Sequence, residues 1–303
     1  MKFVQMSKRV LLFVGVNILV ITTISLVLGL LGVRGRMGNE GYTGLLIFCF
    51  VWGMGGAFIS LAISRMTAKW FMGVKVIDPQ TQDREQQQLL EMVYGFAQSA
   101  RLPERPQVGI YDSPEVNAFA TGPTKSRSLV AVSRGLLNTM RRDELEGVIA
   151  HEVAHIANGD MVTMTLVQGI INALVMFLAR ILAFAVSQAL RSRDDRGGGY
   201  FMNFMLIMVF QTVLSLLGML VVNWFSRQRE FRADAGSARY AGREKMISAL
   251  RGLQRVYERT IEDKHAPSLN TLKISGQSEG WMHLLTATHP PLEERIARLE
   301  QLR

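Results

Sequence analysis

The chain has 303 residues, a net charge of +9, a hydrophobic content of 49% and a single cysteine, Cys49. One cysteine excludes an internal disulfide and a thiolate metal site, and we expect Cys49 to be a packing residue. The basic charge is compatible with nucleic-acid binding, but no nucleic-acid motif is present. Much of the basic excess flanks apolar segments, where anionic lipid headgroups are the expected partners.

Four apolar segments are long enough to cross the hydrocarbon core of a bilayer, which needs about 20 residues at about 1.5 Å per residue. They are residues 10–31, 42–64, 161–190 and 200–225. We therefore predict a mainly α membrane protein with four transmembrane helices, the first a retained anchor rather than a cleaved signal. The third carries one charge, Arg180, which is expected to snorkel to the interface or to find a partner.

Basic residues beside these spans predict the orientation of the chain. They are Lys2, Lys8, Arg9, Arg65, Lys69, Lys75, Arg227, Arg229 and Arg232. By the positive-inside rule, both termini and the two parts of the chain outside the spans at 66–160 and 226–303 are cytoplasmic, although the loops on the other side are basic too. The predicted domains are a two-span anchor at 1–65, a first cytoplasmic part at 66–160, a membrane hairpin at 161–225 and a second cytoplasmic part at 226–303.

Between the second and third spans, the pattern predicts an amphipathic helix followed by a small sheet. Residues 83–102 have apolar side chains at helical spacing and precede two prolines. Short strands are predicted at 107–111 and 129–133, separated by the segment Asn117-Ala118-Phe119-Ala120. The strand at 129–133 is either an exposed edge that could pair with an extended peptide or an ordinary core strand.

The most informative motif follows this sheet: His151-Glu152-Val153-Ala154-His155. It lies in a segment predicted to be helical as far as Gly159. Residues four apart on a helix share a face, so both imidazoles can bind one metal ion while Glu152 stays free to act as a base. The alternative is a polar helix surface, but the apolar neighbours favour buried histidines, for which a metal is a partner.

A third ligand must come from elsewhere in the chain. Glu230 and Asp234 stand four apart on another predicted helix, where Glu230 is the expected ligand and Asp234 the residue that orients a ligand imidazole. The alternative is an exposed charge network with nearby arginines. Asp160 is a weaker rival ligand, because a continuous helix would place it about 140° from the histidine face unless the Asn158-Gly159 break redirects it.

Near the end of the chain, Thr288-His289-Pro290-Pro291 precedes a short predicted helix with Leu292, Ile296 and Leu299 on one face. His289 is either a structural residue or a donor to the oxyanion formed during hydrolysis. Asn117 is either a turn residue or a donor that faces the substrate.

With these features together, the chain closely resembles the bacterial HtpX proteases over nearly its full length. These are membrane-embedded zinc endopeptidases related to the CAAX prenyl endopeptidases. The segments that carry the resemblance are residues 117–120, 151–155, 158–160, 229–231, 233–236 and 288–291. Arg141 and Arg232 depart from the family's pattern, which affects the surface more than the chemistry.

The resemblance implies one Zn²⁺ ion per chain and a cytoplasmic α+β catalytic domain of the zincin (gluzincin) type. The implied zinc ligands are His151, His155 and Glu230. It also implies Glu152 as the catalytic base and Asp234 as the orienting residue. It favours His289 as the oxyanion donor and Asn117 as a contact to the substrate or transition state.

The function that the resemblance implies is that of an endopeptidase that cleaves misfolded or damaged membrane proteins, or unfolded polypeptides, in quality control at the bacterial inner membrane. Homo-oligomerisation is left open. The enzymatic alternative is a prenyl-protein processing endopeptidase. The non-enzymatic alternative is a membrane scaffold with a structural zinc ion, against which Glu152 argues, because a structural site has no use for an unliganded carboxylate.

Overall fold

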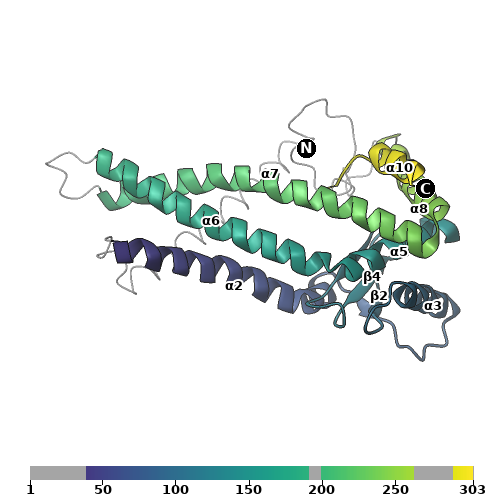
Figure 1. Ribbon diagram of the computed structural model, residues 1–303. Coiled ribbons are helices and arrows are strands. Elements are labelled where there is room, and N and C mark those ends of the chain that lie inside the picture. The colour runs from purple at the N-terminus through teal and green to yellow at the C-terminus, as the bar shows by residue number, and fades with distance from the viewer. Residues whose placement is uncertain (1–38, 191–198, 263–288, 303) are drawn as a thin grey trace. The chain divides into compact units, whose positions relative to one another are not determined.

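The structure is a computed structural model that describes residues 39–190, 199–262 and 289–302 (Figure 1). The predicted first span at 10–31 lies outside the described residues. The chain folds into two compact units, each of which has most of its contacts within itself. Among the described residues, unit 1 contains 39–57, 167–190 and 199–221, and unit 2 contains 58–166, 222–262 and 289–302.

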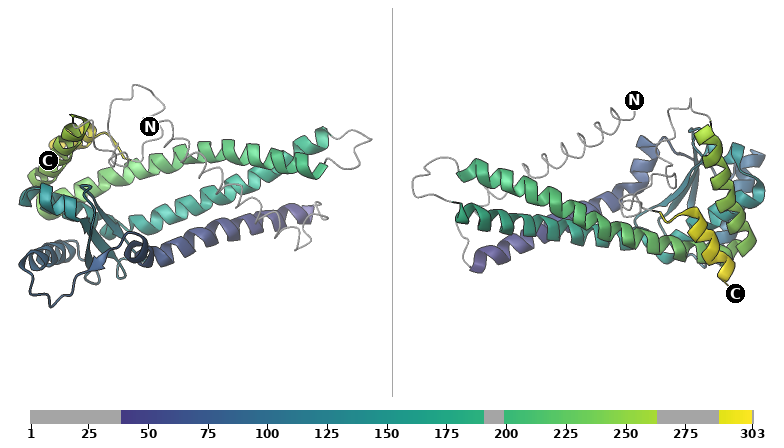
Figure 2. Two further views of the ribbon diagram at one scale, coloured as in Figure 1. Left: turned by 180° about the vertical axis from the view of Figure 1, so that it is seen from behind. Right: turned by 90° about the horizontal axis from the view of Figure 1, so that it is seen from above.

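Three long helices supply unit 1: α2 (Asn39–Phe71), α6 (Asp160–Ala189) and α7 (Gly199–Ala241). Their unit 1 portions lie side by side in Figures 1 and 2. Each is long and apolar enough to cross a membrane, and together they contain the predicted second, third and fourth spans. The 43 residues of α7 are about 65 Å long, roughly twice the thickness of a hydrocarbon core, so only part of this helix is needed for a crossing.

Close packing holds these helices together, because small residues allow backbones to approach. A Cβ atom at Gly53 of α2 would lie 2.7 Å from the backbone nitrogen of Ala173 in α6. Arg180 of α6 is only 5% exposed, and its Nη1 donates to the carbonyl oxygen of Met176 at 2.8 Å. The expectation that Arg180 snorkels is therefore wrong, since the side chain turns back onto its own helix between apolar neighbours.

A four-stranded mixed sheet forms the centre of unit 2. Its strands are β1 (Lys75–Val76), β2 (Gln107–Tyr111), β3 (Ala118–Thr121) and β4 (Leu129–Ser133), in the order β1-β2-β4-β3. β2 and β4 pair in parallel, whereas β1 and β3 are antiparallel to their neighbours. The two predicted strands are confirmed, and β3 forms from the predicted connection between them.

β4 is not the exposed edge that one interpretation of 129–133 required. All five of its residues are buried, and it pairs with β2 on one side and β3 on the other. The physical reason is its composition, because a strand with apolar side chains in succession needs cover on both faces. The edge position beside β4 belongs to β3 instead.

Both faces of this sheet are covered. Val130 and Val132 of β4 belong to the main core with α3 (Arg84–Ser99) and α5 (Arg142–Asn158). Leu129 and Ala131 point the other way, towards Ala68 at the end of α2. The alternation of side chains along β4 thus places α5 directly against the sheet.

Local signals fix the helix boundaries in unit 2. Asp83 caps α3 by accepting from the amides of Glu85 and Gln86, as expected for the predicted helix at 83–102. α5 ends at Asn158 and is capped by Gly159, whose φ of 73° is left-handed, and α6 begins at Asp160. The remaining helices are α4 (Arg134–Thr139), α8 (Arg243–Glu262) and α10 (Leu292–Gln301), the last of which is the predicted short C-terminal helix.

Candidate metal centre

Two helices of unit 2, α5 and the end of α7, build the candidate metal centre. Small residues let them approach closely: a Cβ atom at Gly236 of α7 would lie 2.8 Å from the Cβ atom of Ala154. Ser237 adds a hydrogen bond from its hydroxyl to the carbonyl oxygen of Gly147 at 2.9 Å. These contacts hold the carboxylates of α7 against the histidine face of α5.

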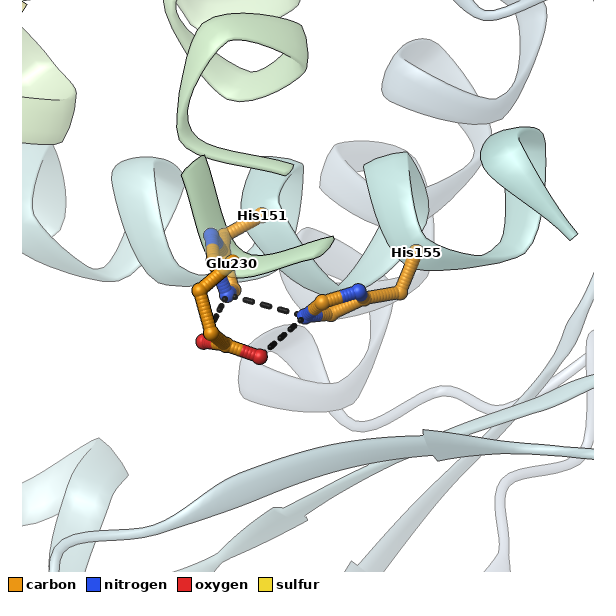
Figure 3. Close-up of side chains that lie close together, drawn as sticks. All are labelled: His151, His155 and Glu230. Carbon is orange, nitrogen blue, oxygen red and sulfur yellow. Dashed lines mark hydrogen bonds and ion pairs between the residues drawn. The ribbon is translucent and has the colours of Figure 1, made fainter. Parts of the chain in front are cut away.

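His151, His155 and Glu230 converge at this contact (Figure 3). The Nε2 atoms of the two histidines lie 3.1 Å apart. Glu230 Oε2 lies 3.4 Å from His151 Nε2, and Glu230 Oε1 lies 3.4 Å from His155 Nε2. Glu230 is 1% exposed, and its Oε1 has no hydrogen-bond partner among the described residues.

This triangle fits a tetrahedral metal ion. Ligand atoms held at about 2.0–2.1 Å from such an ion lie about 3.3–3.4 Å apart, close to the three distances between these atoms. Without a cation, two imidazole lone pairs and a carboxylate would face one another inside the protein, which is unfavourable. The residues present can therefore hold a metal ion, and one nitrogen or oxygen donor comes from each of three side chains.

A buried carboxylate and a buried guanidinium support His151 from behind. Asp234 Oδ1 lies 3.0 Å from His151 Nδ1, an ion-pair contact whose angle falls outside that of a regular hydrogen bond. Arg295 of α10 grips both oxygens of Asp234, at 2.8 and 2.6 Å. It also lies 3.7 Å from Glu230 Oε2, so one arginine supports two carboxylates of the site.

Asp160 takes the corresponding position behind His155. Its Oδ2 lies 2.7 Å from His155 Nδ1, at hydrogen-bond distance and angle. The side chain of Asp160 is 2% exposed. The alternative of Asp160 as a ligand does not match this geometry, because its oxygen lies at Nδ1, whereas Nε2 is the nitrogen that faces Glu230.

The electrostatics of the site favour positive charge at the imidazoles. Burial lowers the pKa of His151, but the carboxylates of Asp234 and Glu230 outweigh burial and raise its pKa to about 9. Burial also opposes protonation of His155, yet Asp160 and Glu230 leave its pKa raised. In the metal-free chain, the negative charge of these carboxylates therefore favours protonated imidazoles. The same negative charge would favour a bound metal cation.

The other predicted site residues have different surroundings. Glu152 lies on α5 between the two histidines and is half-buried. His289 Nδ1 lies 2.9 Å from Glu230 Oε2, and its side chain is 33% exposed. Asn117 is held by its backbone, which exchanges hydrogen bonds with Ser133 at the end of β4. The structure thus brings His289 to the metal centre and places Asn117 at the start of β3.

Sequence reasoning missed Arg295. Its neighbours Leu292 and Leu299 were recognised as one apolar face of a short helix, and Arg295 lies on that face at helical spacing. A charged residue among buried apolar positions was the signal available, because such a residue needs a buried partner of opposite charge. The identity of that partner required the fold.

These features define the class of the protein: a metal-dependent hydrolase with apolar helices long enough to cross a membrane. The chain belongs to peptidase family M48, whose model matches residues 82–303. The predicted resemblance is confirmed, and the family assignment makes the protein a metallopeptidase.

Curated relatives match over almost the whole chain. The Protease HtpX homologs of Bacillus licheniformis and Bacillus subtilis are 51% and 50% identical, and both alignments cover 97% of this chain and 99% of the relative. Protease HtpX of Idiomarina loihiensis is 48% identical over 98% of this chain and 100% of its own length. These similarities support a membrane metalloprotease.

A solved structure shows the same fold. The crystal structure of S. mikatae Ste24p matches with a TM-score of 0.62 at 17% sequence identity. The match covers 98% of this chain but 66% of the Ste24p chain. At this identity the likeness concerns the fold alone.

Proposed function

We propose that the chain is a zinc endopeptidase that cleaves misfolded or damaged membrane proteins in quality control at the bacterial inner membrane. The observation that carries the proposal is the triangle of His151, His155 and Glu230 with Glu152 beside it, since Glu152 is not needed as a ligand. A catalytic centre leaves such a carboxylate free, whereas a structural site does not require one.

The proposed metal ligands are His151, His155 and Glu230, with one zinc ion per chain. When bound there, zinc would polarise the scissile carbonyl and make water more acidic. Glu152 would remove a proton from the attacking water and later deliver it to the leaving amine. Asp234 holds His151 in the orientation that this requires, because its carboxylate lies at Nδ1.

His289 is the proposed donor to the oxyanion of the tetrahedral intermediate. Its position beside Glu230 supports a role at the reacting carbonyl, and its partial exposure leaves the ring accessible to a substrate. Asn117 is proposed as a substrate contact at the start of β3. Because β3 is the edge strand that packs against α5, an extended peptide can add to the sheet there by main-chain pairing.

The proposed organisation has four transmembrane helices, a gluzincin-type catalytic domain and both termini in the cytoplasm. Its domain boundaries are those given above: 1–65, 66–160, 161–225 and 226–303. The contact of His155 with Glu230 supports it, since residues before and after the hairpin meet only if the chain crosses the membrane an even number of times. Basic residues beside the spans would bind anionic headgroups.

The deciding experiment compares the parent protein with Glu152→Gln, purified in detergent, by zinc content and by cleavage of an unfolded casein-type substrate. We expect one zinc per chain in both proteins and at least about 100-fold less cleavage in the variant, the scale of general-base loss. Glu91→Gln is the matched control, because Glu91 is an exposed glutamate on α3 in the same unit. Full cleavage by Glu152→Gln would refute the assignment.

Prenyl-protein processing is the rival enzymatic function. The likeness to Ste24p does not favour it, because that likeness is one of fold. Parallel assays with a C-terminally prenylated peptide and an unfolded membrane protein separate the two functions. Preference for the prenylated peptide would replace the quality-control role while leaving the metal centre and Glu152 in place.

A further inference from the structure

At the junction between α5 and α6, a buried carboxylate, that of Asp160, contacts His155 but has no part in the proposed mechanism. Asp160 is the first residue of α6, and one residue, Gly159, separates it from the end of α5. On a continuous helix Asp160 would point about 140° away from the histidine face. The left-handed conformation of Gly159, with φ of 73°, redirects the chain so that the carboxylate reaches His155.

The contact fixes which nitrogen of His155 is available to a metal. Asp160 Oδ2 lies 2.7 Å from Nδ1. Because an ionised carboxylate can only accept, this contact favours the tautomer in which Nδ1 carries the proton and donates it. The Nε2 lone pair then points towards Glu230 and His151, at 3.4 and 3.1 Å. Asp160 is therefore excluded as a ligand in this arrangement, although its carboxylate is buried beside the site.

A simpler role for Asp160 would be to stabilise the first turn of α6 through the helix dipole. Two observations favour the imidazole instead. The carboxylate is 2% exposed, too buried for a charge that serves only a helix end. Two amides in the first turn of α6, those of Val162 and Thr163, donate to the carbonyl oxygen of Gly159 rather than to the side chain of Asp160.

We propose that Asp160 is a positioning residue for the metal centre that holds His155 in its ligating tautomer and orientation. The proposal rests on the proposed metal site. Each imidazole then has a carboxylate at its Nδ1 atom. Asp234 of α7 contacts Nδ1 of His151, and Asp160 of α6 contacts Nδ1 of His155. Arg232 lies 3.7 Å from Asp160 Oδ1, but its side chain is 60% exposed, so its contribution is small.

The test measures zinc affinity of the full chain in detergent by competition with a chelator, for the parent and Asp160→Asn. We expect one zinc per chain in both and an affinity about 10–100-fold weaker in Asp160→Asn, the usual effect of perturbing an outer hydrogen-bonding partner. The amide is a neutral and therefore weaker acceptor than the carboxylate, and its NH2 group can also turn towards Nδ1. The absorption spectrum of the Co²⁺-substituted protein should change as well, because the orientation of His155 sets the ligand geometry.

Two controls bracket this expectation. Asp143→Asn removes a carboxylate from α5, the helix that carries His155. This carboxylate accepts from Ser248 rather than from a histidine, so the variant should keep the parent affinity. Arg232→Gln should change the affinity by less than about threefold, since the exposed ion pair is weak.

A separate measurement distinguishes positioning from a general loss of stability. Zinc raises the thermal midpoint by an amount set by its affinity, so weaker binding shrinks the zinc-induced rise. A purely structural role would lower the midpoints with and without zinc equally and leave that rise unchanged, which would overturn the proposal. If Asp160→Ala does not fold, the isosteric Asp160→Asn still decides.

The outcome for Asp160 is separable from the outcome for the proposed function. Parent-like zinc affinity and Co²⁺ spectrum in Asp160→Asn, with an inactive but zinc-loaded Glu152→Gln, would refute the role of Asp160 alone. Failure of the parent protein to bind zinc would refute both.

Discussion

Buried charges are treated differently in the two units of the molecule. In unit 2, Arg295 makes two hydrogen bonds to Asp234, and Glu144 contacts both Arg141 and Arg255. In unit 1, Arg180 is buried to a similar degree, but its Nη1 donates to a backbone carbonyl oxygen. Its Nη2 has no hydrogen-bond partner in the described part of the chain.

This difference determines how much stability is lost when a buried arginine is replaced. A buried ion pair loses several kcal/mol when one partner is removed, because the other is left uncompensated. A buried charge that relies on a backbone carbonyl leaves no opposite charge behind when it is removed. The same substitution of arginine by methionine should therefore have unequal effects in the two units.

The largest effect is expected for Arg295→Met. It removes the bidentate partner of Asp234 and a neighbour of Glu230, so the zinc-loaded protein should lose about 3–5 kcal/mol of stability. Thermal unfolding in detergent measures the loss. Arg298→Met on the same helix is the control, because Arg298 is half-exposed over the ring of Phe231 and should cost less than about 1 kcal/mol. Equal losses in the two variants would contradict the pairing described for unit 2.

Removing the metal should give the next largest effect, and it should depend on pH. The pKa of His151 rises from its ordinary 6.5 to about 9 in the metal-free fold. A raised pKa contributes stability that is complete below pH 6.5 and disappears as the pH rises to 9, at about 1.4 kcal/mol per pH unit. The thermal midpoint of the metal-free protein should therefore fall across this range.

Zinc should change that dependence, because it binds the neutral imidazoles and competes with protons. The zinc-induced rise in the midpoint should thus grow between pH 6.5 and 9. A metal-free protein that is equally stable at both ends of the range would show that Asp234 and Glu230 do not hold a proton on His151.

The smallest effect is expected for Arg180→Met in unit 1. Methionine has a similar volume and no charge to bury, so stability should change by less than about 1 kcal/mol or increase. Midpoints measured in the same detergent as Arg295→Met provide the comparison, and an unchanged zinc content shows that the metal centre is intact. A loss as large as that of Arg295→Met would mean that Arg180 has a strong partner, and the contrast between the units would fail.

The spacing of apolar residues along the sequence predicts many of the helices and strands. The helical spacing around the HExxH motif predicted α5, and two short apolar runs predicted β2 and β4. These elements follow from local composition, in which apolar positions recur at the period of a helix or a strand. The second, third and fourth predicted spans lie in long apolar helices for the same reason.

Pairings between distant segments were not readable in the same way. The order of strands places β3 rather than β4 at the edge, because β2 pairs directly with β4 although β3 lies between them in the sequence. The role of Asp160 depends on one left-handed glycine, and that of Arg295 on the docking of α10. Spacing located the chemistry on each helix, but tertiary contacts decided which side chains share a site.

Only one residue, Gly159, links α5 to α6, so a movement of one helix is transmitted directly to the other. A helix that crosses a bilayer adjusts its tilt to the thickness of the lipid around it. Any tilt that reaches the first turn of α6 displaces the carboxylate against the His155 ring, because Gly159 is the only linker between them. For the proposed zinc site, this predicts that the affinity for zinc depends on lipid thickness and differs between thin and thick membranes.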